Sequence, residues 1–229
     1  MGDWIKLKAS DGHEFNAYLA KPAKEPVGAV VVVQEIFGVN KSIRAVADHY
    51  AAQGFLGIAP AIFDRYERDV ELGYGEADMK RAFQVFYPKL DPNVTLLDIA
   101  AAFHYAKEHG KPTGVLGFCY GGLAAWVAAV RGEKLRMQPD CCVCYYPGGI
   151  GKFAKEEPAS PVLIHFGGAD DHIGADQVEA VRTAHPQVEI HIYEGAGHAF
   201  ANPDRPSYQA DAAKLADRRS LEFLKKHLA

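Results

Sequence analysis

A glycine-rich segment around Cys119 constrains the fold of this chain more than any other feature. The apolar run 113–117 leads into Gly-Phe-Cys-Tyr-Gly-Gly, and a helix of small residues follows at 123–130. The spacing Gly-x-Cys-x-Gly is typical of a sharp strand-to-helix turn that presents a nucleophile, because only glycine lets neighbouring backbones approach so closely. Such a turn places the sulfur at a helix N-terminus, where the dipole and free N–H groups favour negative charge. The alternative is a buried, unreactive cysteine in a glycine-rich turn.

Strand and helix patterns alternate along the whole chain. The β-branched run at 28–33 is typical of a strand buried on both faces of a parallel sheet. Further strands are expected at 55–59, 113–117, 140–146, 161–166 and 188–193, and helices at 42–53, 93–109, 176–184 and 208–228. This alternation predicts an α/β fold with a mostly parallel central sheet and helices on both faces. Because no repeat or linker interrupts the pattern, we expect one domain over 1–229.

Composition and charge exclude several classes of function. The net charge of -4 gives no basic surface for nucleic acid, and no apolar run is long enough to cross a membrane. The N-terminus lacks the pattern of a signal peptide. The four cysteines have no disulfide-framework spacing, which indicates free thiols in a reducing compartment, and we therefore expect a cytoplasmic protein.

Residues 61–92 are the least regular part of the sequence. Charged and aromatic side chains are mixed there without a clear period. We expect loops and a helix above one end of the sheet, where substrate contacts usually lie. The pattern leaves open whether this segment is a closed lid or an open rim.

Three candidate catalytic side chains each follow a predicted strand. Cys119 follows one strand, Asp170 and Asp171 follow a later one, and His198 follows the last. The carboxyl ends of parallel strands lie at one edge of a sheet, so these groups are expected to meet there. The order nucleophile, acid, base suits a thiolate, a histidine that exchanges protons near neutral pH, and a carboxylate that orients it. We prefer Asp171 as the acid, although the pattern also permits Asp170.

Four motifs make the chain resemble the dienelactone hydrolases (carboxymethylenebutenolidases), a cysteine-dependent branch of the α/β-hydrolase fold. They occur in the family's order and span nearly the whole sequence: Gln34 to Asn40, Gly117 to Gly122, Gly168 to His172, and Ala196 to Phe200. The resemblance implies a single-domain α/β-hydrolase fold and hydrolysis of an ester or lactone.

The resemblance also implies roles for individual residues. Cys119 would be the nucleophile, Asp171 the acid and His198 the base. Glu35 would lie beside the thiol in the resting enzyme. The backbone N–H groups of Ile36 and Tyr120 would form the oxyanion hole.

Three residues are expected to contact substrate. By resemblance, Arg65 falls where the family has an arginine that binds the substrate carboxylate. Asn202 stands four residues after the base, where the dienelactone-cleaving enzymes have a second arginine. A charged bidentate contact would there become a neutral hydrogen bond, which weakens the case for the dienelactone itself as the preferred substrate, and dienelactone-like anionic substrates are expected. Tyr145, at the end of the strand at 140–146, is the third candidate.

The leaving group limits the substrates that a cysteine nucleophile can cleave. A thiolate leaves a tetrahedral intermediate more readily than an alkoxide does, so productive cleavage needs a stabilised leaving group. We therefore expect activated enol or aryl esters, or lactones, of anionic character, cleaved through a thioester. The expected partner is this small molecule alone, with no cofactor and no metal, and the chain is expected to be a monomer or a small homo-oligomer.

The sequence argues against two other functions. The segment Cys141-Cys142-x-Cys144 resembles a cluster of metal ligands. However, alternation along a strand points Cys141 to one face and the other two to the opposite face, and no second cysteine pair completes a tetrahedral set. The glycines at 117–122 lack the spacing of a dinucleotide-binding loop. A ligand-binding relative without catalytic activity is the remaining alternative.

Overall fold

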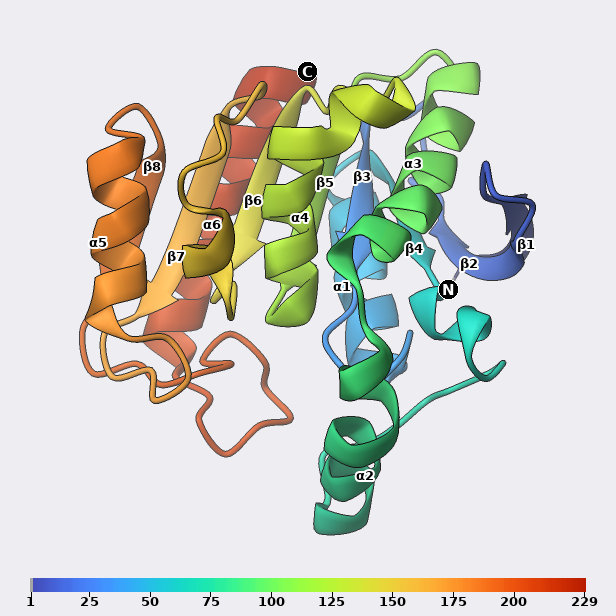
Figure 1. Cartoon of the computed structure of the whole chain (residues 1–229). Coiled ribbons are helices and arrows are strands. Elements are labelled where there is room, and N and C mark those ends of the chain that lie inside the picture. Colours follow the sequence, from blue (N-terminus) through green and yellow to red (C-terminus); the bar gives the residue numbers. More distant parts are fainter. Residues whose placement is uncertain (1) are drawn as a thin grey trace.

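Eight strands form one sheet in the order β1-β2-β4-β3-β5-β6-β7-β8 in the computed structural model, which describes residues 2–229 (Figure 1). The strands are β1 (Asp3–Lys8), β2 (Glu14–Ala20), β3 (Gly28–Val33), β4 (Phe55–Pro60), β5 (Thr113–Phe118), β6 (Cys141–Tyr145), β7 (Val162–Gly167) and β8 (Glu189–Tyr193). Strands β1 and β2 are antiparallel, and β2 is antiparallel to β4. The other neighbouring pairs are parallel. The predicted α/β fold with a mostly parallel sheet is therefore confirmed.

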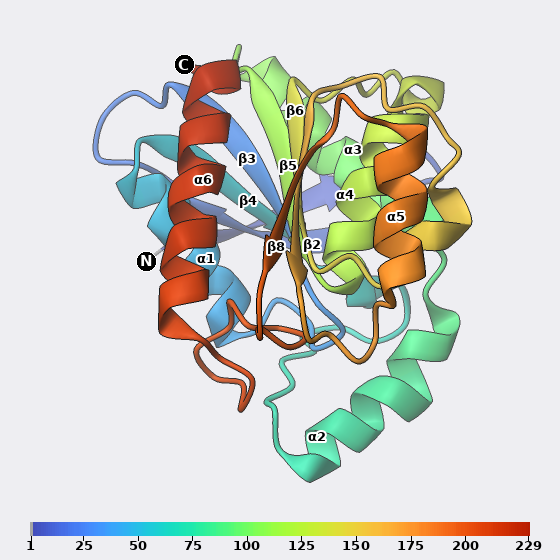
Figure 2. The same ribbon diagram turned by 90° about the vertical axis from the view of Figure 1, so that its left-hand side faces the viewer.

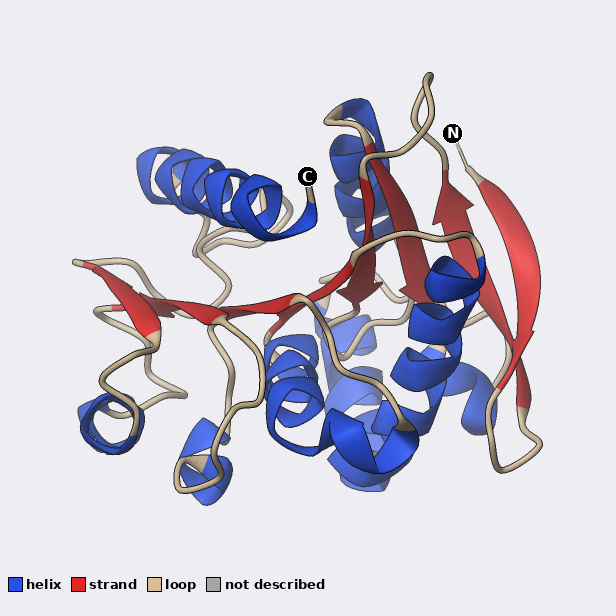
Figure 3. Cartoon of the chain, turned by 90° about the horizontal axis from the view of Figure 1, so that it is seen from above, coloured by secondary structure: helices blue, strands red, loops and turns tan. Residues whose placement is uncertain are grey.

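Helices cover both faces of the sheet. The main helices are α1 (Lys41–Ala52), α2 (Glu76–Arg81), α3 (Pro92–Glu108), α4 (Tyr120–Arg131), α5 (Ala175–Ala184) and α6 (Ala210–Leu228). Seen from above, α1 and α6 lie on one face, and α3, α4 and α5 lie on the other (Figure 3). None of the helices within residues 2–229 is long and apolar enough to span a bilayer.

The centre of the sheet is buried on both sides, as the sequence pattern predicted. Every residue of β3, β4 and β5 is buried, and the β-branched run Val30 to Val33 has no exposed surface. Helix α4 packs directly on β5 and β6, and its small residues allow this close approach. Trp126 on α4 is fully buried and donates its indole N–H to the carbonyl of Phe153.

The chain reverses its direction of winding at β3 and β5. After β3 the chain crosses through α1 to β4 on one side, whereas β5 pairs with β3 on the other side. In open α/β sheets, ligands bind at such a switch point, outside the carboxyl ends of the strands. Glu35 comes just after β3 and Cys119 just after β5, so both lie at this point.

Residues 61–92 contain four short helical segments joined by loops, where the sequence predicted loops and a helix. They comprise 3-10 turns at Ile62–Arg65 and Tyr87–Lys89, helix α2, and a π-helical turn at Ala82–Phe86. Phe63 and Phe86 stack face to face and belong to a second apolar cluster, separate from the main core, that also contains Phe37 and Tyr120. Helix α2 itself buries no residue and projects from the body of the protein (Figure 2).

Candidate active site

Cys119 occupies the turn between β5 and α4 in a strained backbone conformation. Its φ of 53° and ψ of -116° lie in a region that residues with a side chain rarely adopt. The neighbouring glycines make the turn feasible. A Cβ on Gly117 would collide with the carbonyl of Gly121, and one on Gly121 would collide with the carbonyl of Val33. The predicted sharp turn is thus present, with the partly exposed thiol at the N-terminus of α4.

Two other residues at the strand ends have similar backbone strain. Tyr146 follows β6 with a φ of 36°, and Ala199 follows the candidate base with a φ of 62°. Such conformations persist only where the surrounding structure enforces them, and they are common at active sites. Their position beside Cys119 and His198 indicates that this edge of the sheet is built for function.

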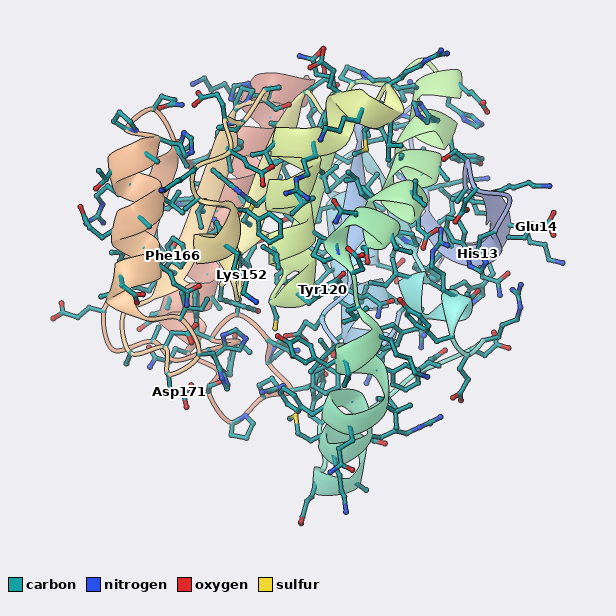
Figure 4. The ribbon with its side chains drawn as sticks, viewed as in Figure 1. His13, Glu14, Tyr120, Lys152, Phe166 and Asp171 are labelled. Carbon is teal, nitrogen blue, oxygen red and sulfur yellow. The ribbon has the colours of Figure 1, made fainter. Side chains whose placement is uncertain are left out.

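The histidine pairs with Asp170 and not with Asp171. His198 Nδ1 lies 2.8 Å from Asp170 Oδ2, and the Asp170 side chain has no exposed surface. The other carboxylate oxygen of Asp170 accepts the N–H groups of His172 and Ile173. Asp171 is 83% exposed, its ion-pair partner is His172 at 3.6 Å, and Figure 4 shows it at the outer edge of the molecule. The preference for Asp171 was therefore wrong, and the alternative, Asp170, holds the histidine.

The surroundings of His198 favour its protonated form. Burial alone would lower the pKa of His198, but its hydrogen bonds to Asp170 and Cys119 outweigh this effect and raise the pKa to about 10. Burial likewise opposes charge on Asp170, yet the bond from His198 and the two backbone N–H groups lower the pKa of this carboxyl. Asp170 is thus hydrogen-bonded to His198, and both Asp170 and Cys119 favour the charged form of the imidazole.

Glu35 is buried at the same edge of the sheet, but its hydrogen bonds lead away from the thiol. Its Oε2 accepts the amide N–H of Asn202 at 3.0 Å and the hydroxyl of Tyr74 at 3.4 Å. Within residues 2–229, no hydrogen bond joins Glu35 to the Cys119 sulfur. Burial raises the pKa of Glu35 despite the nearby positive charge of Arg205 and the bond from Asn202.

Arg65, predicted to bind a substrate carboxylate, is paired with carboxylates of the protein itself. Its guanidinium donates to both oxygens of Asp98, at 2.8 and 2.7 Å, and to Asp11 at 2.7 Å. The Asp98 side chain has no exposed surface, and the Arg65 side chain is 12% exposed. Two carboxylates of the protein therefore occupy this arginine, which ties η1 (Ile62–Arg65) to α3.

The two carboxylates on Arg65 should contribute very unequally to stability. Replacing Asp98 with alanine should lower the free energy of unfolding by about 3 kcal/mol or more, because it leaves a largely buried guanidinium without its main partner. Replacing Asp11, which is 38% exposed, should cost less than about 1 kcal/mol. Urea unfolding of both variants would measure the difference. Equal losses would contradict this account of the cluster.

The two other predicted substrate contacts, Asn202 and Tyr145, lie in different surroundings. The Asn202 amide donates to Glu35 and, at 2.8 Å, to the Tyr74 hydroxyl, so it lies within the candidate site. Tyr145 is buried, and its hydroxyl lies 2.7 Å from Ser220 Oγ on α6. That hydroxyl is already paired within the core, so the substrate contact predicted for Tyr145 has no support in this geometry.

Arg205 is a candidate site residue that the sequence reasoning missed. Its guanidinium carbon lies 5.5 Å from the ring centres of both Phe37 and Tyr74. Its Nε is buried without a hydrogen-bond partner, and within residues 2–229 no carboxylate pairs with it. The sequence places Arg205 in a turn-rich loop with no catalytic motif, so only tertiary structure could bring it beside Glu35.

The three remaining cysteines lie in the core. Cys141, Cys142 and Cys144 on β6 have no exposed surface. Burial raises the pKa of the Cys141 thiol to about 12 and raises that of the Cys144 thiol further. Cys119 is therefore the cysteine placed for chemistry.

Comparison with known proteins agrees with the motifs. Residues 15–228 match the model of the dienelactone hydrolase family. The chain is 33% identical to a carboxymethylenebutenolidase of Pseudomonas putida, over 96% of this chain and 94% of that protein. A second carboxymethylenebutenolidase, from Pseudomonas sp. strain P51, is 32% identical over 97% of this chain and 94% of its own length.

A solved structure shows the same fold. The crystal structure of a provisionally assigned dienelactone hydrolase from Klebsiella pneumoniae has a TM-score of 0.82 and 29% sequence identity to this chain. The match covers 97% of this chain and 99% of that one. The resemblance inferred from four short motifs thus extends over the full length. On this evidence the chain is a hydrolase and belongs to the dienelactone hydrolase family.

Proposed function

We propose that the protein hydrolyses activated esters or lactones of anionic character through a thioester on Cys119. The observation that carries this proposal is the hydrogen bond between His198 and the buried Asp170, together with Cys119 at a strained strand-to-helix turn on the same edge of the sheet. Asp170 fixes the imidazole and stabilises its positive charge, and the imidazolium in turn favours a thiolate at Cys119.

The reaction proceeds in two steps. The Cys119 sulfur attacks the ester carbonyl carbon, and the developing oxyanion accepts the N–H groups of Ile36 and Tyr120, each worth about 3 kcal/mol by comparison with other acyl-transfer enzymes. The carbon–oxygen bond then breaks, and His198 protonates the leaving oxygen. In the second step a water molecule gives a proton to His198 and attacks the thioester, so that the carbon–sulfur bond breaks and the thiolate beside the imidazolium is restored.

Tyr120 and Ile36 are suitably placed for the oxyanion. Tyr120 is the first residue of α4, and the first N–H groups of a helix have no partner within it. Ile36 directly follows Glu35 beyond the end of β3, the strand that neighbours β5. This position in the chain supports our proposal that the two N–H groups bind the oxyanion beside the Cys119 sulfur.

Arg205 supports an anionic substrate in place of Arg65. It is a cation without a carboxylate partner within residues 2–229, and it lies against Tyr74, which also contacts Glu35 and Asn202. A substrate carboxylate could accept hydrogen bonds from its guanidinium and from the Asn202 amide. The family has a second arginine at the position of Asn202. In our proposal, Arg205 supplies the positive charge that this arginine would have supplied.

Substrate comparison tests the proposal. The purified protein should cleave a dienelactone, followed by its loss of ultraviolet absorbance, and p-nitrophenyl acetate, each at least about 100-fold faster in kcat/KM than ethyl acetate. Arg205→Gln should lower kcat/KM for the dienelactone by about 10- to 100-fold, the value of a charged hydrogen bond, and should leave p-nitrophenyl acetate nearly unchanged. Faster cleavage of ethyl acetate than of the activated esters would overturn the chemistry. Equal losses for both activated esters would overturn the role of Arg205.

A further inference from the structure

His172 contacts the ring of the proposed base, but its side chain has no role in the two steps described above. The rings of His172 and His198 are nearly perpendicular, at 84°, with 4.7 Å between their centres. The backbone N–H of His172 donates to one oxygen of Asp170 at 2.8 Å, and the other oxygen of Asp170 pairs with His198. One carboxylate therefore fixes the backbone of His172 next to the imidazole.

The side chain of His172 is also within reach of a molecule in the site. It is 55% exposed, whereas the side chain of His198 is 10% exposed. The ring of Tyr146 also contacts the imidazole, at 5.2 Å between centres, but it is fully buried. Of these two rings that pack on the base, His172 is the one that a substrate can touch.

The order of the strands places His172 and the proposed anion-binding residues on opposite sides of the thiol. Cys119 follows β5, Glu35 follows β3 on one side of β5, and His172 follows β7 on the other side (Figure 1). Asn202 comes from the loop after β8, but its hydrogen bond to Glu35 holds it on the β3 side. A substrate whose carboxylate lies near Asn202 therefore extends across Cys119 toward His172.

The leaving group belongs on the side of His172. In the proposed reaction His198 protonates the leaving oxygen, so that oxygen must lie within hydrogen-bond distance of the imidazole. The rest of the leaving group then lies against the exposed ring that packs on this imidazole, which is His172. A flat, conjugated leaving group gains contact there, because rings pack well on rings in offset or edge-to-face arrangements.

We propose that His172 is a specificity-determining residue that binds the leaving group and favours an aryl or other flat, conjugated leaving group over a small one. This inference rests on the proposed function and adds the chemical class of the leaving group to it. Conjugation both stabilises the departing oxygen and makes the group flat. The contact with His172 and the requirement of the Cys119 thiolate therefore select the same substrates.

Two esters that share an acyl group test the proposal. Both p-nitrophenyl acetate and vinyl acetate transfer the same acetyl group to the Cys119 sulfur, and each leaving oxygen takes its proton from His198. The first leaves as an aromatic phenol, and the second as a small enol. Because kcat/KM reports the steps up to departure of the leaving group, the ratio of the two values measures the preference between leaving groups.

Three variants separate the ring of His172 from its surroundings. His172→Ala should lower kcat/KM for p-nitrophenyl acetate by about 3- to 10-fold and change that for vinyl acetate by less than about twofold. His172→Phe keeps a flat ring and should restore the first value to within about twofold of the wild type. Asp171→Asn removes the exposed ion-pair partner of His172 and should change neither value by more than about twofold.

Hydrolysis of the acetyl-enzyme is the second readout. Its rate, followed by mass spectrometry after rapid quenching, should be the same in His172→Ala and the wild type, because the leaving group has already departed. A slower rate in His172→Ala would show that His172 acts by holding His198 and would overturn the proposal. Equal losses of kcat/KM for the two esters, no loss for p-nitrophenyl acetate, or no recovery in His172→Phe would also overturn it.

The mass of the wild-type protein distinguishes failure of this inference from failure of the proposed function. If both esters acetylate Cys119, the proposed function stands, and any of the contrary results above removes only the role of His172. If neither ester acetylates Cys119, the proposed function fails and this inference fails with it.

Discussion

Cys119→Ala should lower kcat for an activated ester by about 10⁶-fold, the loss seen when the nucleophile of a hydrolytic triad is removed. No other thiol can compensate for the missing sulfur, because the other three cysteines are buried in β6. The rate of p-nitrophenol release, measured with wild-type and variant protein at equal concentration, gives the ratio directly. A mass increase of one acyl group on the wild type, absent in the variant, would identify the thioester.

Cys119→Ser provides the matched control for the alanine variant. It preserves the shape of the strained turn and keeps a hydroxyl beside His198, so the fold and substrate binding should be retained while the rate falls. If Cys119→Ala and the wild type cleave the ester equally, Cys119 is not the nucleophile and the proposed reaction fails.

Asp170→Asn should lower kcat by about 10³- to 10⁴-fold, comparable to the loss when the same change is made in a serine-protease triad. Asparagine offers an N–H to His198 Nδ1 and thereby favours the wrong tautomer of the imidazole. It also removes the charge that helps to raise the pKa of His198 to about 10. The alkaline limb of the pH–rate profile, where activity is lost as the imidazolium loses its proton, should therefore shift toward lower pH.

Asp171→Asn is the control, because it makes the same chemical change one residue away. Asp171 is exposed and pairs with His172, so its replacement should change kcat less than about twofold. Ester hydrolysis by the two variants at several pH values separates the carboxylates. A large loss in Asp171→Asn with normal activity in Asp170→Asn would contradict the arrangement seen here.

The sequence predicted the positions of Cys119 and His198 because each depends on a local pattern. A buried strand followed by a glycine-rich turn indicates where a side chain leaves the carboxyl end of a sheet. The same reasoning predicted the sheet, since the β-branched and apolar runs of β3 and β5 have few alternatives. These features require only the residues within each segment.

The choice between Asp170 and Asp171 could not be made from such patterns. Both belong to one turn, and their order along the chain does not show which side chain faces the protein. The decision depends on the carboxylate of Asp170, which caps the N–H groups of His172 and Ile173 while its second oxygen faces His198. That geometry is set by how β7 and β8 lie side by side.

The contacts of Arg65 and Arg205 could not be predicted from the sequence either. Arg65 and Arg205 have long, flexible side chains, and the partner of each is far away in the sequence. Arg65 meets Asp98 on α3, whereas Arg205 packs on Phe37 and Tyr74. A resemblance to a family predicts that an arginine stands at a given position. It does not show which carboxylates of this particular chain already pair with that arginine.

The order of strands in the sheet has a consequence for the synthesis of this protein. Cys119 leaves the ribosome long before His198, which follows the edge strand β8, and α6 covers one face of the sheet only after that. A nascent chain that ends before residue 198 therefore carries a cysteine with no imidazole beside it. The imidazole proposed to activate the sulfur therefore comes from about the last seventh of the chain, so translation products that end before His198 lack it.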